Sequence, residues 1–190
     1  MKKLLIAIGN KAKIDMYKDL LSSLVDVKLY FLSDFKKVEE PVEDGKTVEK
    51  NALIKARYYS AEFGIPALGD DAGFEIEELG GEPGVMARRW GGELPEGVDD
   101  LQWLNYYFKE VKNIEGDIVH GSFPFVRCLY VNENNIFYQE SRARIILGKQ
   151  ILREMKPGWP STAVEIKEEF NQMEDIKKTK KGLLKLISNL

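Results

Sequence analysis

The chain has 190 residues, a length that suits one domain, or one domain with a small appended lobe. A hydrophobic content of 44% is enough for a sizeable core and argues against global disorder, while a net charge of -3 gives no general attraction for nucleic acid. A single cysteine excludes an intramolecular disulfide and fits a reducing cytoplasm, and no apolar run approaches the roughly 18 residues that span a membrane.

The first third of the chain alternates apolar strands with amphipathic helices. Residues 4–8 form an unbroken apolar run, which is typical of a strand covered on both faces. The start, MKKLLIAIG, imitates a signal peptide, but its apolar run is short and we interpret it as a strand. The next expected elements are a helix over 9–24, a strand over 27–35, a helix from an N-cap at Thr47 to Phe63, and a short strand at 66–69.

The remainder of the chain predicts a later antiparallel pair. DDAG (70–73) reads as a turn, FEIEEL (74–79) as an alternating strand, and 99–113 as a helix. Two strands over 119–131 and 136–147, joined by NENN, predict a β-hairpin, and the tail from Glu165 reads as a basic helix. The expected fold class is therefore α/β, with a mixed parallel and antiparallel central sheet and flanking helices.

The turn after the first strand is a candidate phosphate site. Gly9 follows a buried strand and opens a helix, so backbone N–H groups and the positive end of the helix face the carboxyl edge of the sheet. Asn10 can donate an amide hydrogen bond, and Lys13 adds a positive charge one turn later. The spacing matches neither GxxxxGK[ST] nor GxGxxG, so an ordinary strand–helix turn with a solvated lysine is the alternative.

A second candidate lies on the helix that begins near Thr47. Asn51 and Lys55 are four residues apart and share one helix face, where an amide and an ammonium suit a ligand oxyanion. The solvated side of an amphipathic helix is the alternative explanation for this pair.

Three carboxylates form a third candidate. Glu43, Asp70 and Asp71 supply the hard oxygen donors that Mg²⁺ prefers, and a carboxylate in such a site can also deprotonate an attacking water. Asp-Asp-X-Gly is equally good β-turn chemistry, so a plain surface turn is the alternative.

Other reactive residues offer less. The single histidine, His120, argues against a His-rich zinc site and a histidine-based triad, and we expect it to pack at a strand end. Cys128 lies in the apolar sequence VRCLYV and is expected to be an inert buried thiol.

Four pieces of the sequence occur together in a recognisable order: AIGNKAK (7–13), TVEKNALIKAR (47–57), IPALGDDAGFEIEELGGEPGV (65–85) and RRWGGE (88–93). In this order and spacing the chain resembles the inosine triphosphate pyrophosphatase family over residues 4–93. Members of that family hydrolyse non-standard purine nucleoside triphosphates to monophosphate and pyrophosphate. The resemblance implies one elongated, two-lobed domain over 1–190 with a cleft between the lobes, Mg²⁺ (or Mn²⁺) as cofactor, and a homodimer.

The resemblance also implies residue roles. Asp71, Asp70 and Lys55 would be catalytic, with Asp71 as the general base, and Glu43 and Asp71 would bind the metal. The implied substrate-binding positions are Ile8, Gly9, Asn10, Lys13, Asn51, Lys55, Ala72 and Trp159.

The second half of the chain departs from the family pattern. Ala72 replaces the usual serine after the aspartates, and Lys50 interrupts the usual Glu-Asn pair. The Gly-Phe-Gly-Tyr-Asp-Pro segment has no counterpart, although MKPGWPS (155–161) sits roughly there, and KKTKKGLLKL (177–186) stands in place of a Ser-His-Arg motif. Trp159 can stack on a base in compensation, and a surface loop tryptophan held by packing is the alternative. Arg142, Arg144 or the lysine tail can replace the missing arginine.

Three functional hypotheses follow. The first is a Mg²⁺-dependent nucleoside triphosphate pyrophosphatase with an altered base preference. The second is a non-catalytic nucleotide-binding protein that kept the fold. The third, a nucleic-acid-binding module that uses the lysine tail, is disfavoured by the acidic net charge, and neither a nucleic acid nor a membrane is expected as a partner.

Overall fold

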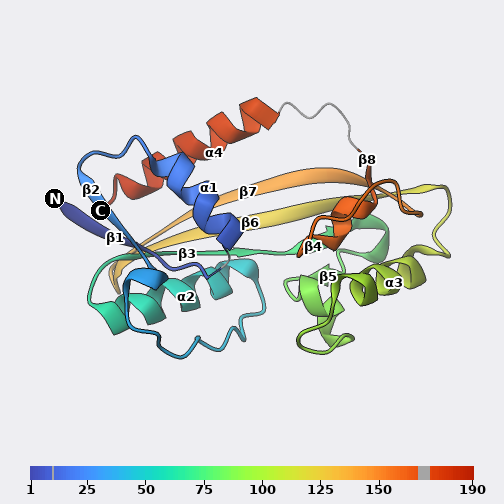
Figure 1. Cartoon of the computed structure of the whole chain (residues 1–190), viewed down its shortest axis with the longest axis horizontal. Helices are drawn as coiled ribbons and strands as arrows, with labels where there is room; N and C mark the ends of the chain where they lie inside the picture. Colours follow the sequence, from blue (N-terminus) through green and yellow to red (C-terminus); the bar gives the residue numbers. More distant parts are fainter. Residues whose placement is uncertain (10, 167–171) are drawn as a thin grey trace. The chain divides into compact units, whose positions relative to one another are not determined.

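The computed structural model describes residues 1–9, 11–166 and 172–190 (Figure 1). The described residues form an eight-stranded sheet with parallel and antiparallel pairs and flanking helices, which confirms the predicted fold class. The strands are β1 (Lys2–Ile6), β2 (Val27–Phe31), β3 (Ala67–Ala72), β4 (Phe74–Ile76), β5 (Pro83–Gly84), β6 (Ile118–Asn132), β7 (Asn135–Gly148) and β8 (Glu165–Ile166). The α-helices are α1 (Lys11–Leu21), α2 (Val48–Phe63), α3 (Asp100–Val111) and α4 (Gln172–Ile187).

The chain divides into two compact units. Unit 1 comprises Met1–Asp71, Phe125–Ser141 and Asn171–Leu190, and unit 2 comprises Ala72–Pro124 and Arg142–Phe170. Within the described residues, no helix is long and apolar enough to cross a membrane.

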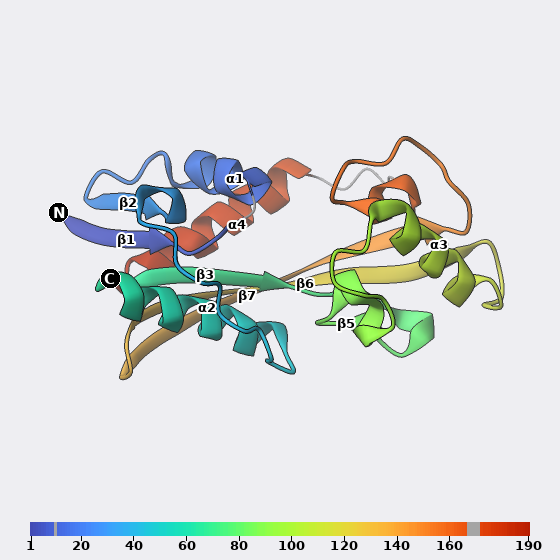
Figure 2. The ribbon, with the colours of Figure 1, turned by 60° about the horizontal axis from the view of Figure 1, so that its bottom comes forward.

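Unit 1 contains three parallel strands whose order in space differs from their order along the chain. The strands β2, β1 and β3 lie in that spatial order and run parallel. In Figures 1 and 2, α1 and α4 lie on one face of these strands and α2 lies on the other. The chain therefore leaves β1 toward one side through α1 and reaches β3 on the other side through α2. In sheets of this kind ligands bind at the carboxyl ends of the strands where the order reverses, which here is the end of β1 and β3.

Alternate residues of the strands in unit 1 face the two helical layers, as the two-residue period of a strand requires. Leu4 and Ile6 of β1 belong to the core cluster that contains Tyr17 of α1. Leu5 belongs instead to the cluster that contains Tyr59 of α2. Because helices cover both faces, the first strand reads as an unbroken apolar run rather than an alternating one.

The ends of α2 follow the local signals in the sequence. Thr47 accepts a hydrogen bond from the Lys50 backbone N–H through its side chain, 3.2 Å long, and so caps the helix. Gly64 ends the helix in the left-handed conformation (φ 66°), which glycine adopts without steric cost. The predicted bounds of this helix are confirmed.

Unit 2 has an aromatic core. Phe74 of β4 packs with Trp90 and with Trp103 and Tyr107 of α3, and all four side chains are buried. The N-terminus of α3 carries a capping box, in which Asp99 accepts from the Gln102 N–H at 2.7 Å and the Gln102 side chain accepts from the Asp99 N–H at 3.2 Å.

Four local predictions were wrong. The DDAG segment is not a turn, because β3 continues through Asp70 and Asp71 to Ala72. The strand expected over 27–35 stops at Phe31, the strand expected over 74–79 stops at Ile76, and a 3₁₀ turn follows each of them. The residues after Glu165 are not helical at once, since Glu165–Ile166 is the strand β8. The first of these errors has a tertiary cause, which the pairing of the two aspartates explains.

Candidate active site

A pocket of about 320 Å³ lies in unit 1 at the carboxyl ends of the parallel strands. Its walls come from the segment after β1, from α1, from the segments that follow β2 and precede α2, from α2 itself, and from β3. The lining residues are Ala7, Ile8, Gly9, Lys13, Leu32, Glu40, Pro41, Glu43, Lys55, Tyr59 and Asp70. Most of the predicted phosphate-binding and catalytic residues of unit 1 therefore meet in one place, where the topology favours a ligand.

Asp70 faces the α1 side of β3 and is almost fully buried, with 5% of its surface exposed. Its Oδ1 lies 2.8 Å from the Lys13 Nζ, and its Oδ2 accepts a hydrogen bond of 3.0 Å from the Tyr17 hydroxyl. Both carboxylate oxygens thus have partners. An aspartate in this position is held in place, and it in turn holds the Lys13 ammonium at the wall of the pocket.

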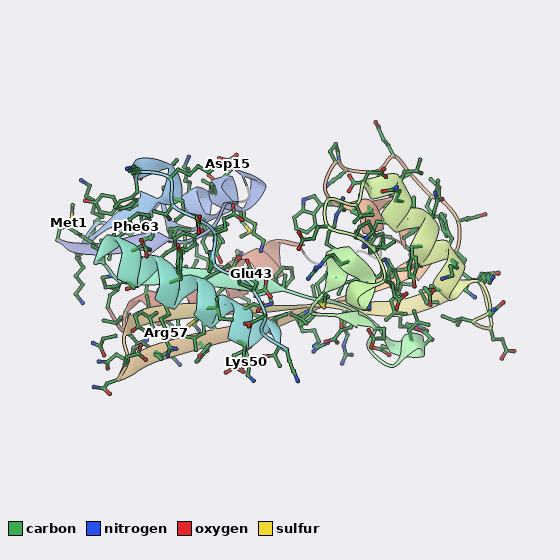
Figure 3. All side chains as sticks on the ribbon, turned by 90° about the horizontal axis from the view of Figure 1, so that it is seen from below. Met1, Asp15, Glu43, Lys50, Arg57 and Phe63 are labelled. Carbon is green, nitrogen blue, oxygen red and sulfur yellow. The ribbon has the colours of Figure 1, made fainter. Side chains whose placement is uncertain are left out.

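Asp71 faces the opposite side of the strand and meets α2. Its Oδ1 lies 2.9 Å from the Lys55 Nζ, and the same ammonium lies 3.0 Å from Glu43 Oε2. One lysine therefore bridges two carboxylates. Figure 3 shows Glu43 on one side of α2, whereas Lys50 and Arg57 project on the other side. The solvent-exposed side of α2 is therefore distinct from the side that faces the pocket.

The pKa shifts in this cluster follow from its burial and its charges. Burial raises the pKa of Asp71 and Glu43 adds to this effect, so the pKa lies above its usual value although Lys55 and Asn51 favour the charged form. Burial lowers the pKa of Lys55, but the charges of Asp71 and Glu43 outweigh it and the pKa is raised. The Lys55 ammonium therefore stays protonated, and any further positive charge beside Asp71 would favour the ionised form of its carboxyl group.

The donor set suits Mg²⁺. Asp71 Oδ2 is buried and accepts no hydrogen bond of normal geometry from the described residues, although the Asn51 amide lies near enough to favour its charge. An ionised oxygen buried in this way lacks a partner that a cation would supply. Glu43 and Asp71 already share one cation, Lys55. The described residues contain no group of three acidic, histidine or cysteine side chains that could form a metal cage, and Mg²⁺ needs only one or two carboxylates when phosphates complete its shell.

Two close backbone approaches position this cluster. A Cβ atom on Gly69 would lie 2.4 Å from the Ala52 carbonyl oxygen and 2.8 Å from the Ala56 nitrogen, so only glycine lets β3 pack this tightly on α2. Asn51 is buried, and its Oδ1 accepts a 2.8 Å hydrogen bond from the Gly45 N–H. This bond ties the loop that carries Glu43 to the helix that carries Lys55, and a substrate contact from Asn51 stays a prediction.

Other predicted site residues are not among those brought together. Asn10 lies outside the described residues. Ala72 ends β3 and Trp159 precedes a 3₁₀ turn, and both belong to unit 2. Arg142, one of the suggested replacements for the missing arginine, is engaged within unit 2 by Glu75 and by Ser122. Base contacts from these residues stay predictions.

Sequence reasoning missed two residues next to the site. Tyr17 lies in the helix expected over 9–24 and was not singled out, yet its hydroxyl donates to Asp70. Arg127 was not singled out, although it donates from Nε to the Tyr17 hydroxyl at 3.0 Å and only 5% of its surface is exposed. The available signal was an arginine inside the apolar strand sequence FVRCLYV, because a buried charge needs a partner elsewhere in the fold.

The fold and the pocket define an α/β protein with a polar ligand site at the switch point of a parallel sheet. Comparison with known proteins identifies its family: residues 4–150 match the Ham1 family model. The chain belongs to the Ham1 family. This agrees with the resemblance inferred from the motifs.

Individual relatives agree with this assignment. The chain is 42% identical over 142 residues to the dITP/XTP pyrophosphatase of Corynebacterium efficiens, a match that covers 74% of this chain and 67% of the relative. It is 34% identical over 142 residues to a dITP/XTP pyrophosphatase of Corynebacterium glutamicum, covering 74% and 68% of the two chains. The solved structure of a Ham1 protein from Coxiella burnetii has the same fold, with a TM-score of 0.76, 23% identity and coverage of 97% of this chain and 100% of that chain.

Proposed function

We propose that the chain hydrolyses non-standard purine nucleoside triphosphates, of the dITP, ITP and XTP type, to the monophosphate and pyrophosphate. The observation that carries the proposal is the pairing of two different charge clusters at one pocket. Lys13 and Asp70 lie at its wall on the α1 side, and Lys55 and Glu43 lie at its wall on the α2 side. The names of the relatives support the same reaction class and the same type of base.

The residues divide the work. The Gly9 N–H after β1, together with Lys13 and Lys55, binds triphosphate oxygens and stabilises the charge that develops as water attacks the α-phosphorus. Ile8 lines the pocket, but its own N–H donates to the Ile6 carbonyl oxygen at 3.0 Å. Asp71 orients that water and accepts its proton while the bond to the pyrophosphate oxygen breaks. A raised Asp71 pKa suits a group that must take up a proton near neutral pH.

The cofactor of the proposal is Mg²⁺, with Mn²⁺ as a substitute. Glu43 and Asp71 would hold the ion, since they already converge on one ammonium and Asp71 has an oxygen without a partner. When bound, Mg²⁺ supplies positive charge that offsets the charge of the triphosphate.

Several finer points belong to the same proposal. They are one domain over 1–190, a homodimer, a base contact from Trp159, and a location in the cytoplasm. The last point rests on the single, buried Cys128, because proteins of oxidising compartments commonly use cysteines in pairs.

A nucleotide panel tests the proposal. Wild-type protein with Mg²⁺ is assayed for pyrophosphate release from ITP, dITP, XTP, ATP and GTP, and we expect turnover of the first three in preference to the last two. Asp71→Asn should lower the rate by roughly 10²–10³-fold. Asp15→Asn, a matched change at an exposed aspartate on α1, should leave it unchanged.

The same experiment separates the enzyme from a binding protein. Tight nucleotide binding by calorimetry, with no product from any member of the panel in Mg²⁺ or Mn²⁺, would replace the hydrolase with the non-catalytic alternative. Equal rates for Asp71→Asn and wild type would remove Asp71 from the chemistry.

A further inference from the structure

A buried chain of polar side chains runs from β6 to the pocket in unit 1. Arg127 on β6 donates from Nε to the Tyr17 hydroxyl at 3.0 Å, and Tyr17 donates to Asp70 Oδ2 at 3.0 Å. Asp70 Oδ1 lies 2.8 Å from the Lys13 Nζ, and Lys13 lines the pocket. Arg127, Tyr17 and Asp70 are at most 5% exposed. This series of hydrogen bonds therefore connects the buried Arg127 guanidinium to the Lys13 ammonium at the wall of the pocket.

Burying the Arg127 guanidinium costs free energy of folding, because the charge loses its hydration. Its neighbours on the strand, Val126 and Cys128, are buried and apolar. Among the described residues Arg127 has no carboxylate within ion-pair distance, and its hydrogen-bond acceptors are the hydroxyls of Tyr17 and Ser141, the latter at 3.4 Å. An apolar residue of similar volume commonly stabilises such a position better than a charge does. The arginine is therefore best explained by what it does to Tyr17.

The direction of the hydrogen bonds follows from the donor inventory. Arginine can only donate, so the Tyr17 oxygen accepts from Arg127 and its hydrogen is left for Asp70. Burial and the nearby Asp70 charge raise the pKa of Tyr17, so the hydroxyl stays protonated throughout the working range. A hydroxyl that is polarised by a cation on one side is a stronger donor to an anion on the other.

We propose that Arg127 and Tyr17 are positioning residues for the triphosphate end of the site. They lock the Asp70 carboxylate, and the locked carboxylate holds the Lys13 ammonium where an anionic phosphate group enters the pocket. This inference rests on the proposed function, because it takes the ligand to be a polyphosphate. It assigns the two consecutive aspartates to different tasks.

The charges of the two clusters support this division. Asp70 pairs with the Lys13 ammonium on one side and is linked through Tyr17 to the Arg127 guanidinium on the other, so two cations flank this carboxylate at the side where Lys13 lines the pocket. Lys55 lies between two carboxylates, so the second cluster carries an excess of negative charge and suits a cation. Loosening the Arg127–Tyr17 link should therefore weaken phosphate binding without weakening metal binding.

Tyr17→Phe tests the link directly, because it keeps the buried ring and removes only the hydroxyl. Inorganic tripolyphosphate without metal is the binding probe, and calorimetry measures its dissociation constant, which should rise roughly tenfold. The dissociation constant of Mn²⁺ without phosphate should stay within about twofold of wild type. In turnover assays KM should rise more than kcat falls.

Tyr107→Phe is the matched control. Tyr107 is also fully buried and its hydroxyl also makes one hydrogen bond, 2.9 Å to the Gly148 carbonyl oxygen, but it belongs to unit 2. This variant should lose stability and bind tripolyphosphate as wild type does. If both tyrosine variants weaken tripolyphosphate equally, the effect is a general loss of structure and the inference is overturned.

A second pair of variants covers the case in which Tyr17→Phe fails to fold. Arg127→Lys keeps a charged donor and should retain more tripolyphosphate affinity than Arg127→Met. Equal affinities for the two variants overturn the inference. The binding measurement does not depend on turnover. If the wild type binds tripolyphosphate but hydrolyses no nucleotide, the proposed function is wrong and this inference is not affected. If the wild type hydrolyses nucleotides and Tyr17→Phe binds tripolyphosphate with unaltered affinity, only this inference is wrong.

Discussion

Asp70 and Asp71 are consecutive on β3, yet each pairs with a different lysine on a different helix. Asp70 lies 2.8 Å from Lys13 of α1, and Asp71 lies 2.9 Å from Lys55 of α2. The alternation of a strand turns adjacent side chains to opposite faces, so two neighbouring carboxylates avoid each other and enter two separate charge clusters. The two aspartates therefore belong to two separate charge clusters and do not form one acidic patch.

The first prediction separates those roles by substitution to asparagine. Asp71→Asn should abolish Mn²⁺ binding measured by calorimetry without nucleotide, because it removes a charged oxygen that has no other partner. Asp70→Asn should leave the Mn²⁺ dissociation constant within about twofold, since both oxygens of Asp70 are already engaged by Lys13 and Tyr17.

Stability should respond in the opposite order. Asp70→Asn removes the buried carboxylate charge that pairs with Lys13 at 2.8 Å and accepts a hydrogen bond from Tyr17, and should cost about 3 kcal/mol or more in the free energy of unfolding, measured with urea. Asp71→Asn should cost less, because burial already disfavours its charge. Metal binding lost equally in both variants would contradict the division of roles.

The second prediction concerns the one cysteine. Cys128 is fully buried, and burial raises the pKa of its thiol to about 12. At pH 8 the native protein should therefore show almost no reaction with a chromogenic disulfide reagent, and unfolding in urea should release one reactive thiol per chain. Rapid reaction of the native protein would contradict the burial.

The same shift gives a sign for the pH dependence of stability. The unfolded thiol ionises near its usual pKa of 9.0, whereas the folded thiol does so near 12. The buried neutral thiol of Cys128 therefore stabilises the folded state fully below pH 9. This stabilisation is lost as the pH rises toward 12, because only the unfolded state releases the thiol proton in that range. Cys128→Ala should show a shallower loss of stability over this window than wild type.

The sequence predicted those parts of unit 1 that local signals determine. The N-cap at Thr47 and the C-cap at Gly64 fixed the bounds of α2, and the apolar run after Lys3 announced a strand buried on both faces. The candidate residues Gly9, Lys13 and Lys55 lie on these elements or next to them, and all three line one pocket. Helix caps and strand periodicity act over a few residues, so one sequence is enough to read them.

The sequence could not predict the state of the DDAG segment. Turn chemistry favoured a turn, but the strand continues because Asp70 finds partners 57 and 53 residues away in Lys13 and Tyr17. The partner that completes this chain, Arg127, is 110 residues from Tyr17. Tertiary pairing of this range overrides a local preference, and no spacing in the sequence encodes it.

The third prediction tests the contact between β3 and α2. Gly69→Ala should destabilise the fold by about 1–3 kcal/mol, because the new Cβ would meet backbone atoms of Ala52 and Ala56 at 2.4 and 2.8 Å. The melting temperature should fall by roughly 2–12 °C. Gly9→Ala is the control, since a Cβ there meets nothing within 4 Å, and it should melt as wild type does. Similar melting temperatures for all three proteins would show that the two elements can separate freely.

The fourth prediction treats Lys55 as a competitor of the metal. Its ammonium lies 3.0 Å from Glu43 and 2.9 Å from Asp71, so a divalent cation that binds these carboxylates must displace or share it. Lys55→Met removes the competing charge and keeps most of the apolar stem. We expect Mn²⁺ to bind roughly tenfold more tightly in calorimetry without nucleotide.

The same variant should be a poorer enzyme, because Lys55 is also assigned to the phosphate oxygens, and pyrophosphate release should fall by roughly 10²–10³-fold. Lys50→Met is the matched control: Lys50 lies on the same helix but projects from its other side in Figure 3, so neither quantity should change. Weaker Mn²⁺ binding in Lys55→Met would mean that the lysine organises the carboxylates for the metal. Tighter binding with slower turnover would identify Lys55 as the residue that holds the two carboxylates together until metal and phosphate arrive.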